Sequence, residues 1–323
     1  MLEGRALHAA AVGLAWPVEL ALSAGQENVP VEPPIFILGP QRSGTTLFYK
    51  CFMQHQQVCM IDQAADYFPS RYLCASALFR AIGADTATDF LERYDARKDL
   101  WIRTWKNNGY GYTEGNRVWN KLGAYGTWNS EGHRRWARRF FPSLVRKIER
   151  RTGKPVFLNK CPGNALRIAQ LRELFPGARF IHLERDPRGV VNSIVNIHRS
   201  LGVSAWGPMP VPAKDLVGLT EYEAVARQWV AITDSIAAGL AQVPDACKRS
   251  VRYEEFLADP RGTLDRLARF FGLDAFASPV AMELRMDRKA GWRAEIPADE
   301  VARIERIIVD AGHAKSLISS AGR

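Results

Sequence analysis

The sequence predicts an α/β fold, a single domain with a central parallel β-sheet flanked by helices. Short apolar runs alternate with longer amphipathic segments along most of the 323 residues, and strands that alternate with helices form parallel sheets. The first apolar run, residues 35–38, leads directly into Gly39 and Gly44, which have the spacing of a phosphate-binding loop. Residues 66–152 lack this regular alternation and are rich in tryptophan and glycine. They are predicted to form a helical and loop insertion that binds an acceptor molecule, with a secondary apolar core as the alternative.

The glycine-bounded loop has an unusual composition for a phosphate-binding loop. A nucleoside triphosphatase needs Lys directly after the second glycine, but this chain has Thr45-Thr46 there. The only cation of the loop is Arg42. We expect the backbone N–H groups of the loop and of the following helix, residues 45–54, to surround an anion without that lysine. A strand–helix turn without a ligand is the alternative.

The remaining elements follow from local signals. Asp186-Pro187 is typical of a helix start, with an N-cap residue followed by proline at the first helical position. An arginine-rich helix is predicted over residues 133–151, with an interruption at Pro142. Its apolar face is predicted to contain Trp136, Phe140, Leu144 and Ile148. Further strands are expected at 58–62, 156–158, 179–183 and 250–253, and further helices at 164–175, 187–198, 220–241, 260–271 and 297–311.

Composition limits the function classes. The net charge of +10 indicates anionic partners, such as a nucleotide, a polyanionic acceptor, nucleic acid or a membrane surface. The five cysteines are scattered without metal-ligand spacing, which predicts reduced thiols and a cytoplasmic protein. Residues 1–34 are predicted as an N-terminal helical extension, with a secretion signal as the alternative, and no stretch has the length of a transmembrane helix.

A second anion site follows from the strand at 179–183. Arg185 comes just after this strand, and Ser193 lies eight residues further on, inside the next helix. A ligand held both there and at the glycine-bounded loop must carry phosphate-like groups at two separated places.

These motifs occur in an order that resembles a known enzyme family. The chain contains Gly39–Leu47, then Leu158-Asn-Lys-Cys-Pro162, Arg185 with Ser193, Arg252–Pro260, and Arg288-Lys-Ala-Gly-Trp-Arg293. This set resembles the sulfotransferases that use 3′-phosphoadenosine-5′-phosphosulfate (PAPS), including their protein-tyrosine and carbohydrate branches. The resemblance spans about residues 35–300. It implies a sulfotransferase domain over 35–323 with a P-loop nucleotide-kinase-like fold, PAPS as donor, adenosine 3′,5′-bisphosphate (PAP) as product, and no metal.

The resemblance also implies roles for particular residues. Arg42 matches the catalytic cation of the loop, and Lys160 matches a catalytic lysine of the protein-tyrosine branch. Sulfuryl transfer should have a loose transition state, so positioning and charge neutralisation suffice for catalysis. The basic segment near 288 departs from the family pattern because Ala290 precedes Gly291. The implied donor-binding residues are Gln41, Arg42, Ser43, Gly44, Thr45, Thr46, Arg185, Ser193, Tyr253, Arg288 and Lys289.

The general base is the weakest part of the match. The cytosolic branch has a histidine where this chain has Cys161 and Pro162. Other branches place a carboxylate about twenty residues after the loop, which here selects Asp66 first and Asp62 second. Either aspartate could instead cap a helix. Glu114 and His133 are held in reserve.

Other functions stay open at this point. A P-loop nucleotide kinase or triphosphatase is one alternative, although the lysine and a Mg²⁺-binding aspartate are missing. A basic nucleic-acid-binding protein is another, supported only by charge and tryptophans. The expected partners are a small-molecule or glycan acceptor, without nucleic acid, and a homodimer is left open.

Overall fold

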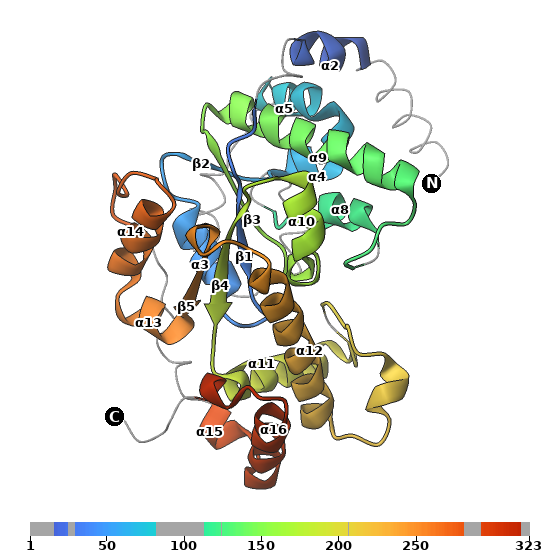
Figure 1. Ribbon diagram of the computed structural model, residues 1–323, viewed down its shortest axis with the longest axis vertical. Helices are drawn as coiled ribbons and strands as arrows, with labels where there is room; N and C mark the ends of the chain where they lie inside the picture. Colours follow the sequence, from blue (N-terminus) through green and yellow to red (C-terminus); the bar gives the residue numbers. More distant parts are fainter. Residues whose placement is uncertain are drawn as a thin grey trace. The chain divides into compact units, whose positions relative to one another are not determined.

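The computed structural model describes residues 16–24, 30–81, 113–123, 125–205, 207–280 and 292–317. The chain divides into two compact units, and each is described by itself. The first unit comprises residues 1–34, 57–161 and 172–177, and the second comprises residues 35–56, 162–171 and 178–323. The strand pairings within each unit are parallel, and helices flank them (Figure 1). The predicted α/β fold class is therefore confirmed.

The first unit contains a short strand pair and several helices. The strands β2 (Val58–Cys59) and β3 (Val156–Lys160) pair in parallel, with Val58 opposite Val156 and Cys59 opposite Phe157. β2 is thus shorter than the strand predicted over 58–62, and β3 is longer than the one predicted over 156–158. The helices are α2 (Trp16–Ser23), α4 (Gln63–Tyr67), α5 (Tyr72–Ala81), α8 (Asn116–Trp119) and α9 (Glu131–Thr152), with 3₁₀ turns η1 (Pro69–Arg71) and η2 (Asn120–Leu122).

The arginine-rich helix α9 is continuous through Pro142, where the sequence predicts an interruption. Ser130 caps its start by accepting a hydrogen bond from His133 N, and Gly153 ends it with a φ of 68°. Leu144 and Ile148 of the predicted apolar face are buried, whereas Trp136 is 39% exposed and Phe140 is half-buried. Burial of the apolar face of α9 compensates for the backbone hydrogen bond that Pro142 cannot make. This buried face consists of Ala137, Phe141, Leu144, Val145 and Ile148.

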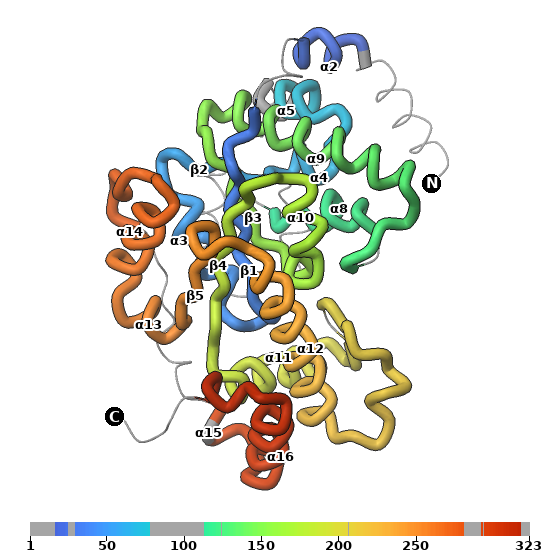
Figure 2. The backbone as a smooth tube through the Cα atoms, viewed as in Figure 1, coloured from blue at the N-terminus to red at the C-terminus, as the bar shows by residue number. Residues whose placement is uncertain are grey.

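The second unit is built on three parallel strands. β4 (Arg179–Glu184) pairs with β1 (Ile35–Leu38) on one side and with β5 (Lys248–Arg252) on the other, and Figure 2 shows β1 and β4 running side by side. All four side chains of β1 are buried, as its continuous apolar run predicts. The other elements are α3 (Thr45–Phe52), η3 (Pro162–Leu166), α11 (Pro187–Leu201), η4 (Ala213–Leu216), α12 (Glu221–Ala241), η5 (Asp245–Cys247), α13 (Tyr253–Ala258), α14 (Pro260–Phe270), α15 (Trp292–Glu295), α16 (Ala298–Asp310) and η7 (Ala314–Ser316).

Two predicted boundaries in this part of the chain change. Tyr253 was expected at the end of a strand but begins α13. The helix expected over 164–175 is divided into η3 and α10 (Ile168–Leu174), and α10 crosses from the second unit into the first along the chain.

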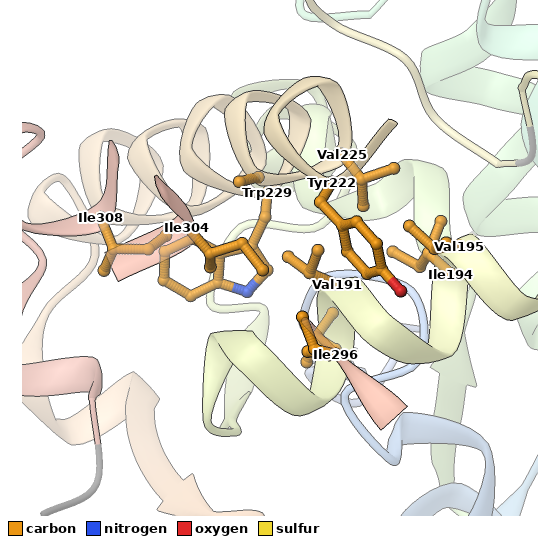
Figure 3. Close-up of a cluster of buried hydrophobic side chains, with 11 residues drawn as sticks. Val191, Ile194, Val195, Tyr222, Val225, Trp229, Ile296, Ile304 and Ile308 are labelled. Carbon is orange, nitrogen blue, oxygen red and sulfur yellow. The ribbon is translucent and has the colours of Figure 1, made fainter. Parts of the chain in front are cut away.

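A cluster of apolar side chains fixes α11 against two later helices. Val191, Ile194 and Val195 of α11 face Val225 and Trp229 of α12 (Figure 3). Ile304 and Ile308 of α16 complete this cluster. Burial of such side chains contributes about 1.5–3 kcal/mol each, so α11 is held firmly where it follows β4. Among the described residues, no helix is long and apolar enough to cross a membrane.

Candidate functional site

The segments that follow the three strands of the second unit meet at one edge of its sheet. In the strand register, Leu38 of β1 lies opposite His182 of β4, and Glu184 lies opposite Arg252 of β5. Because parallel strands end at the same edge, the segments that follow them lie near one another. These segments are residues 39–44 after β1 (loop 39–44), Arg185 after β4, and Tyr253 after β5. The topology therefore explains why residues so far apart in sequence form one site.

The backbone conformation at the end of loop 39–44 requires glycine. Gly44 has a φ of 92°, and a Cβ placed on it would lie 2.2 Å from Cε2 of Tyr253. The Tyr253 ring therefore rests directly on the loop backbone. Burial raises the pKa of Tyr253, and the nearby Arg185 opposes this shift without reversing it. The ring is thus a neutral phenol at neutral pH, suited to stacking on a flat ligand.

Arg42 connects the two predicted anion sites. It has a φ of 68°, the only positive φ outside glycine among the described residues. Its Nε donates a 2.9 Å hydrogen bond to Ser193 Oγ on α11. Its carbonyl oxygen accepts a 2.7 Å hydrogen bond from Nη1 of Arg185, and the Arg185 guanidinium lies 5.0 Å from the centroid of the Tyr253 ring. Arg42, Arg185, Ser193 and Tyr253 were predicted as site residues from sequence, and the structure brings them together.

The start of α3 offers backbone donors at the same place. Gly44 is its N-cap and supplies no side-chain cap, so the first-turn N–H groups can bind an anion. Ser43 is fully buried, and its hydroxyl donates a 2.7 Å hydrogen bond to Pro40 O. Thr45 is buried and Thr46 is half-buried. Gln41 is buried and donates a 3.4 Å hydrogen bond to Pro208 O.

Asp66, the first predicted general base, lies in the first unit and caps α8. Its Oδ1 accepts hydrogen bonds from the backbone N–H groups of Arg117 and Val118, at 3.1 and 3.2 Å, and its Oδ2 accepts one from Thr113 at 3.2 Å. Burial raises the pKa of Asp66, while these three hydrogen bonds lower it. Asp62, the second predicted base, caps α4 through a 2.8 Å hydrogen bond from Ala65 N. The capping alternative raised from the sequence thus describes the contacts of both aspartates.

Lys160 forms a buried ion pair in the same unit. It ends β3, is 4% exposed, and donates a short hydrogen bond to the carboxylate of Glu114. The neighbouring Asn159 donates a 3.1 Å hydrogen bond to the Glu114 carbonyl oxygen and so fixes its backbone. Glu114, held in reserve on sequence grounds, is therefore the carboxylate partner of Lys160.

Other predicted features have different surroundings. His133 lies 2.8 Å from Lys121 O and stacks on Trp136. Glu173 accepts hydrogen bonds from Arg134 and Arg138, at 2.6 and 2.8 Å, so part of the arginine-rich face of α9 is neutralised. Arg288 and Lys289 lie outside the described residues. Within the described ranges, no three His, Cys, Asp or Glu side chains are grouped to hold a metal ion.

The sequence did not predict one histidine–carboxylate pair of the second unit. His198 on α11 is 3% exposed, and its Nδ1 lies 3.6 Å from Oε1 of Glu221 on α12. The only sequence signal was a histidine four residues after Ile194, on the same face of the predicted helix. That signal did not distinguish a functional histidine from an ordinary buried one.

Comparison with known proteins adds family relationships. A model of the sulfotransferase family matches residues 33–278. The chain is 34% identical over 141 residues to omega-hydroxy-beta-dihydromenaquinone-9 sulfotransferase Stf3 of Mycobacterium bovis, and to the same enzyme of Mycobacterium tuberculosis. The match covers 44% of this chain and 34% of each relative. The chain thus spans about a third of the length of these curated relatives.

Solved structures show the same fold. Sulfotransferase STF9 from Mycobacterium avium superposes with a TM-score of 0.55 at 18% identity, covering 92% of this chain and 80% of that one. Sulfotransferase STF1 from Mycobacterium tuberculosis gives a TM-score of 0.54 at 16% identity, with the same coverages. At such identities the likeness concerns the fold.

Proposed function

The chain belongs to the sulfotransferase family, and we propose that it transfers the sulfuryl group of PAPS to the hydroxyl group of a small-molecule acceptor. The observation that carries this proposal is the pair of hydrogen bonds that join Arg42 to Ser193 and to Arg185. They link the glycine-bounded loop to a second cationic site, as a donor with phosphate groups at two places requires. A cytoplasmic location is part of the proposal, because bacterial PAPS is cytosolic.

Donor binding divides between these two places. Loop 39–44 and the first turn of α3, with Gln41, Ser43, Thr45 and Thr46, would hold the 5′-phosphosulfate. Arg185 and Ser193 would hold the 3′-phosphate, with Arg288 and Lys289 as further predicted contacts. A hydroxyl that accepts a hydrogen bond still has its own proton to donate. Ser193 can therefore bind a phosphate oxygen while it continues to position Arg42. The Tyr253 ring, neutral and packed on Gly44, is suited to contact the adenine.

Catalysis would rest on charge neutralisation by fixed cations. PAPS supplies a sulfuryl group whose bond to the 5′-phosphate breaks as the acceptor oxygen bonds to sulfur. We assign to Arg42 the stabilisation of negative charge on the departing phosphate, because its guanidinium is held at the loop by Ser193. Lys160 is proposed as a second catalytic cation. Its buried partner Glu114 would orient its ammonium group. The contacts of Asp66 and Asp62, the bases predicted from the sequence, support a capping role for both.

The names of the curated relatives support a class of acceptor. The curated relatives are named for a hydroxylated menaquinone derivative, an apolar small molecule with a terminal alcohol. We propose an acceptor of that general kind, a hydroxyl group on a small organic molecule. Glycan and phenolic acceptors are the competing classes that a substrate screen would test.

A binding experiment tests the proposed donor. Isothermal titration should detect PAP binding, and neither ATP with Mg²⁺ nor an oligonucleotide should bind comparably. Removing a charge-assisted hydrogen bond costs about 1.5–3 kcal/mol, so Arg185→Ala should weaken PAP binding by about 10- to 100-fold. Arg266→Ala, which removes an exposed arginine paired with Asp259 in the same unit, is the matched control and should bind PAP normally. Binding of ATP–Mg²⁺ without PAP binding would replace the proposal with a nucleotide kinase.

A transfer assay tests the catalytic assignment. Arg42→Ala should lower the rate of sulfuryl transfer from PAPS by at least about 100-fold, in the range seen when one stabilising donor is removed. Wild-type turnover in this variant would contradict the role given to Arg42.

A further inference from the structure

The second unit contains a cavity directly beside loop 39–44. Its volume is about 50 Å³, enough for a few water-sized groups such as the hydroxyl end of a small molecule. Pro40 and Gln41 of the loop form one wall, Ile194 and His198 of α11 form a second, and α12 forms a third. Gln41 immediately precedes Arg42, and Ile194 immediately follows Ser193. The cavity is therefore lined by the sequence neighbours of both members of the Arg42–Ser193 contact.

The segment 208–211, which contributes Met209 to the lining, is fixed from two sides. Gln41 donates a hydrogen bond to Pro208 O. Gln228 of α12 accepts a 2.9 Å hydrogen bond from Val211 N and donates a 2.8 Å hydrogen bond to Val211 O. Both ends of the segment 208–211 are therefore tied to walls of the cavity, and the side chain of Met209 between them lines it.

His198 is the residue of this lining suited to proton transfer. Within the described part of the chain, its Nε2 is buried and has no hydrogen-bond partner. Leaving a buried polar group unpaired costs about 1–3 kcal/mol. The presence of this unpaired nitrogen inside the protein therefore calls for an explanation. Its other nitrogen, Nδ1, lies 3.6 Å from Oε1 of Glu221. Arg199 in turn holds this carboxylate through a 3.1 Å hydrogen bond to Oε2.

This arrangement matches the requirements for a general base. A carboxylate near one imidazole nitrogen favours the tautomer that leaves the other nitrogen as a proton acceptor. The 3.6 Å separation exceeds hydrogen-bond length, but contacts in unliganded sites often tighten once a substrate is bound. Glu221 would also stabilise the positive charge that forms on the ring.

We propose that this cavity receives the acceptor hydroxyl and that His198 is its general base, an inference that rests on the proposed function. The acceptor O–H bond breaks, and its proton passes to Nε2 of His198. The oxygen bonds to sulfur as the sulfur–oxygen bond to the donor 5′-phosphate breaks, and that phosphate leaves with the electron pair. The rest of the lining sets the acceptor class, an alcohol or phenol on an apolar body. It includes Ile194, Met209, Leu216, Val225, Trp229 and Ile232.

A binding measurement tests the cavity without requiring turnover. PAP-saturated protein is titrated with 1-octanol, 4-nitrophenol and N-acetylglucosamine. Octanol and nitrophenol should bind better than the sugar. Ala224→Phe, which fills the cavity from α12, should abolish that binding while PAP affinity stays unchanged. Ala238→Phe places the same side chain at an exposed position of α12 and should bind both compounds normally. Equal binding by the two variants, or preferential binding of the sugar, would refute the cavity assignment.

A rate measurement tests His198 itself. His198→Gln keeps the size and polarity of the side chain but cannot accept the proton. With labelled PAPS, its kcat for 1-octanol should fall by at least about 100-fold. The fall should be much smaller for 4-nitrophenol, whose hydroxyl ionises near neutral pH without help. A general loss of packing would lower both rates equally. His182→Gln removes a comparable pair, His182 Nδ1 at 3.4 Å from Glu184 Oε1, and should leave both rates unchanged.

The outcomes separate the inference from its premise. Absence of PAP binding and of sulfuryl transfer in the wild-type protein would refute the proposed function. Normal PAP binding and transfer, with an unchanged octanol rate in His198→Gln, would refute only the role of His198. An acceptor-dependent loss in Asp66→Asn instead of His198→Gln would assign the base to Asp66.

Discussion

Substitution of Gly44 by alanine tests whether loop 39–44 requires glycine at its end. The new Cβ would lie 2.2, 2.3 and 2.9 Å from Cε2, Cδ2 and Cζ of Tyr253. Carbon atoms in ordinary contact are about 3.5 Å apart or more, so the ring must shift by about 1.3 Å. The backbone contributes separately, because alanine at a φ of 92° is strained by about 1–2 kcal/mol. Overpacking in a tight site adds about 1–3 kcal/mol.

A second glycine separates these two contributions. Gly272, also in the second unit, has a φ of 75° and open space around the position of a Cβ. Gly272→Ala should lower the free energy of unfolding by about 1–2 kcal/mol, which is the backbone contribution alone. Gly44→Ala should lower it by about 2–5 kcal/mol. Urea titration of both variants measures the difference. Removing the ring in the double variant Gly44→Ala, Tyr253→Ala should eliminate most of that difference, because contacting residues are not additive.

The displaced ring also has a consequence for the donor. The Cζ atom of Arg185 lies 5.0 Å from the centroid of the Tyr253 ring. A shifted ring therefore removes a packing surface from Arg185 and from the proposed adenine site. We expect Gly44→Ala to weaken PAP binding by at least about tenfold, or 1.4 kcal/mol, and Gly272→Ala to leave it unchanged. Equal unfolding free energies for the two variants, or normal PAP affinity in Gly44→Ala, would refute this account of the loop.

Three further predictions concern the first unit. Burial, with the Glu32 charge as a smaller cause, raises the pKa of Glu149 from 4.5 to about 8. The folded state therefore holds a proton that the unfolded state releases, and unfolding free energy should fall as pH rises from 4.5 to 8, by at most about 5 kcal/mol. Glu149→Gln should remove this decline in urea titrations, and an unchanged pH profile would contradict it. Asp66→Ala should lower the free energy of unfolding by about 0.5–2 kcal/mol, because α8 loses its cap. Turnover per folded molecule should stay normal. A hundredfold loss of turnover there would restore Asp66 as the base. Lys160→Met should destabilise by about 3–5 kcal/mol because it leaves the Glu114 charge buried, and adding Glu114→Gln should recover part of that loss. Additive effects in this double variant would argue against the pair.

The parts of the site that the sequence predicts are those with local signals. The apolar run of β1, the glycine spacing of loop 39–44 and the Asp186-Pro187 helix start each act within a few residues, and the structure contains all three elements. Parallel pairing of β1 with β4 then brings the two predicted anion sites together. The interruption expected at Pro142 did not occur, because burial of one face of α9 is a tertiary effect that local propensity does not include.

The contacts that distinguish among the candidate general bases could not be predicted from the sequence. Asp66 meets the N-terminus of α8 about fifty residues later, and Lys160 meets Glu114 across a similar separation. His198 and Glu221 lie on different helices, α11 and α12, which an irregular segment separates in the sequence. Spacing in the sequence carries no signal for such pairs, since they depend on how α8, α11 and α12 pack. A carboxylate at a family-like distance from the loop was therefore the best available prediction.

The contacts of Arg42 also explain why this loop carries arginine inside it instead of lysine. A guanidinium has five N–H donors in a fixed plane, whereas an ammonium group concentrates its donors on one nitrogen. Arg42 can hold Ser193 through Nε without exhausting its capacity to bind an anion, and a lysine making the same contact would place its whole charge there. Because Arg185 donates a hydrogen bond to the Arg42 carbonyl oxygen, removing Arg185 releases the backbone that positions the Arg42 guanidinium. The proposed phosphosulfate and 3′-phosphate sites are therefore coupled through the loop backbone. The effects of Arg42→Ala and Arg185→Ala on PAP affinity should combine to less than their sum.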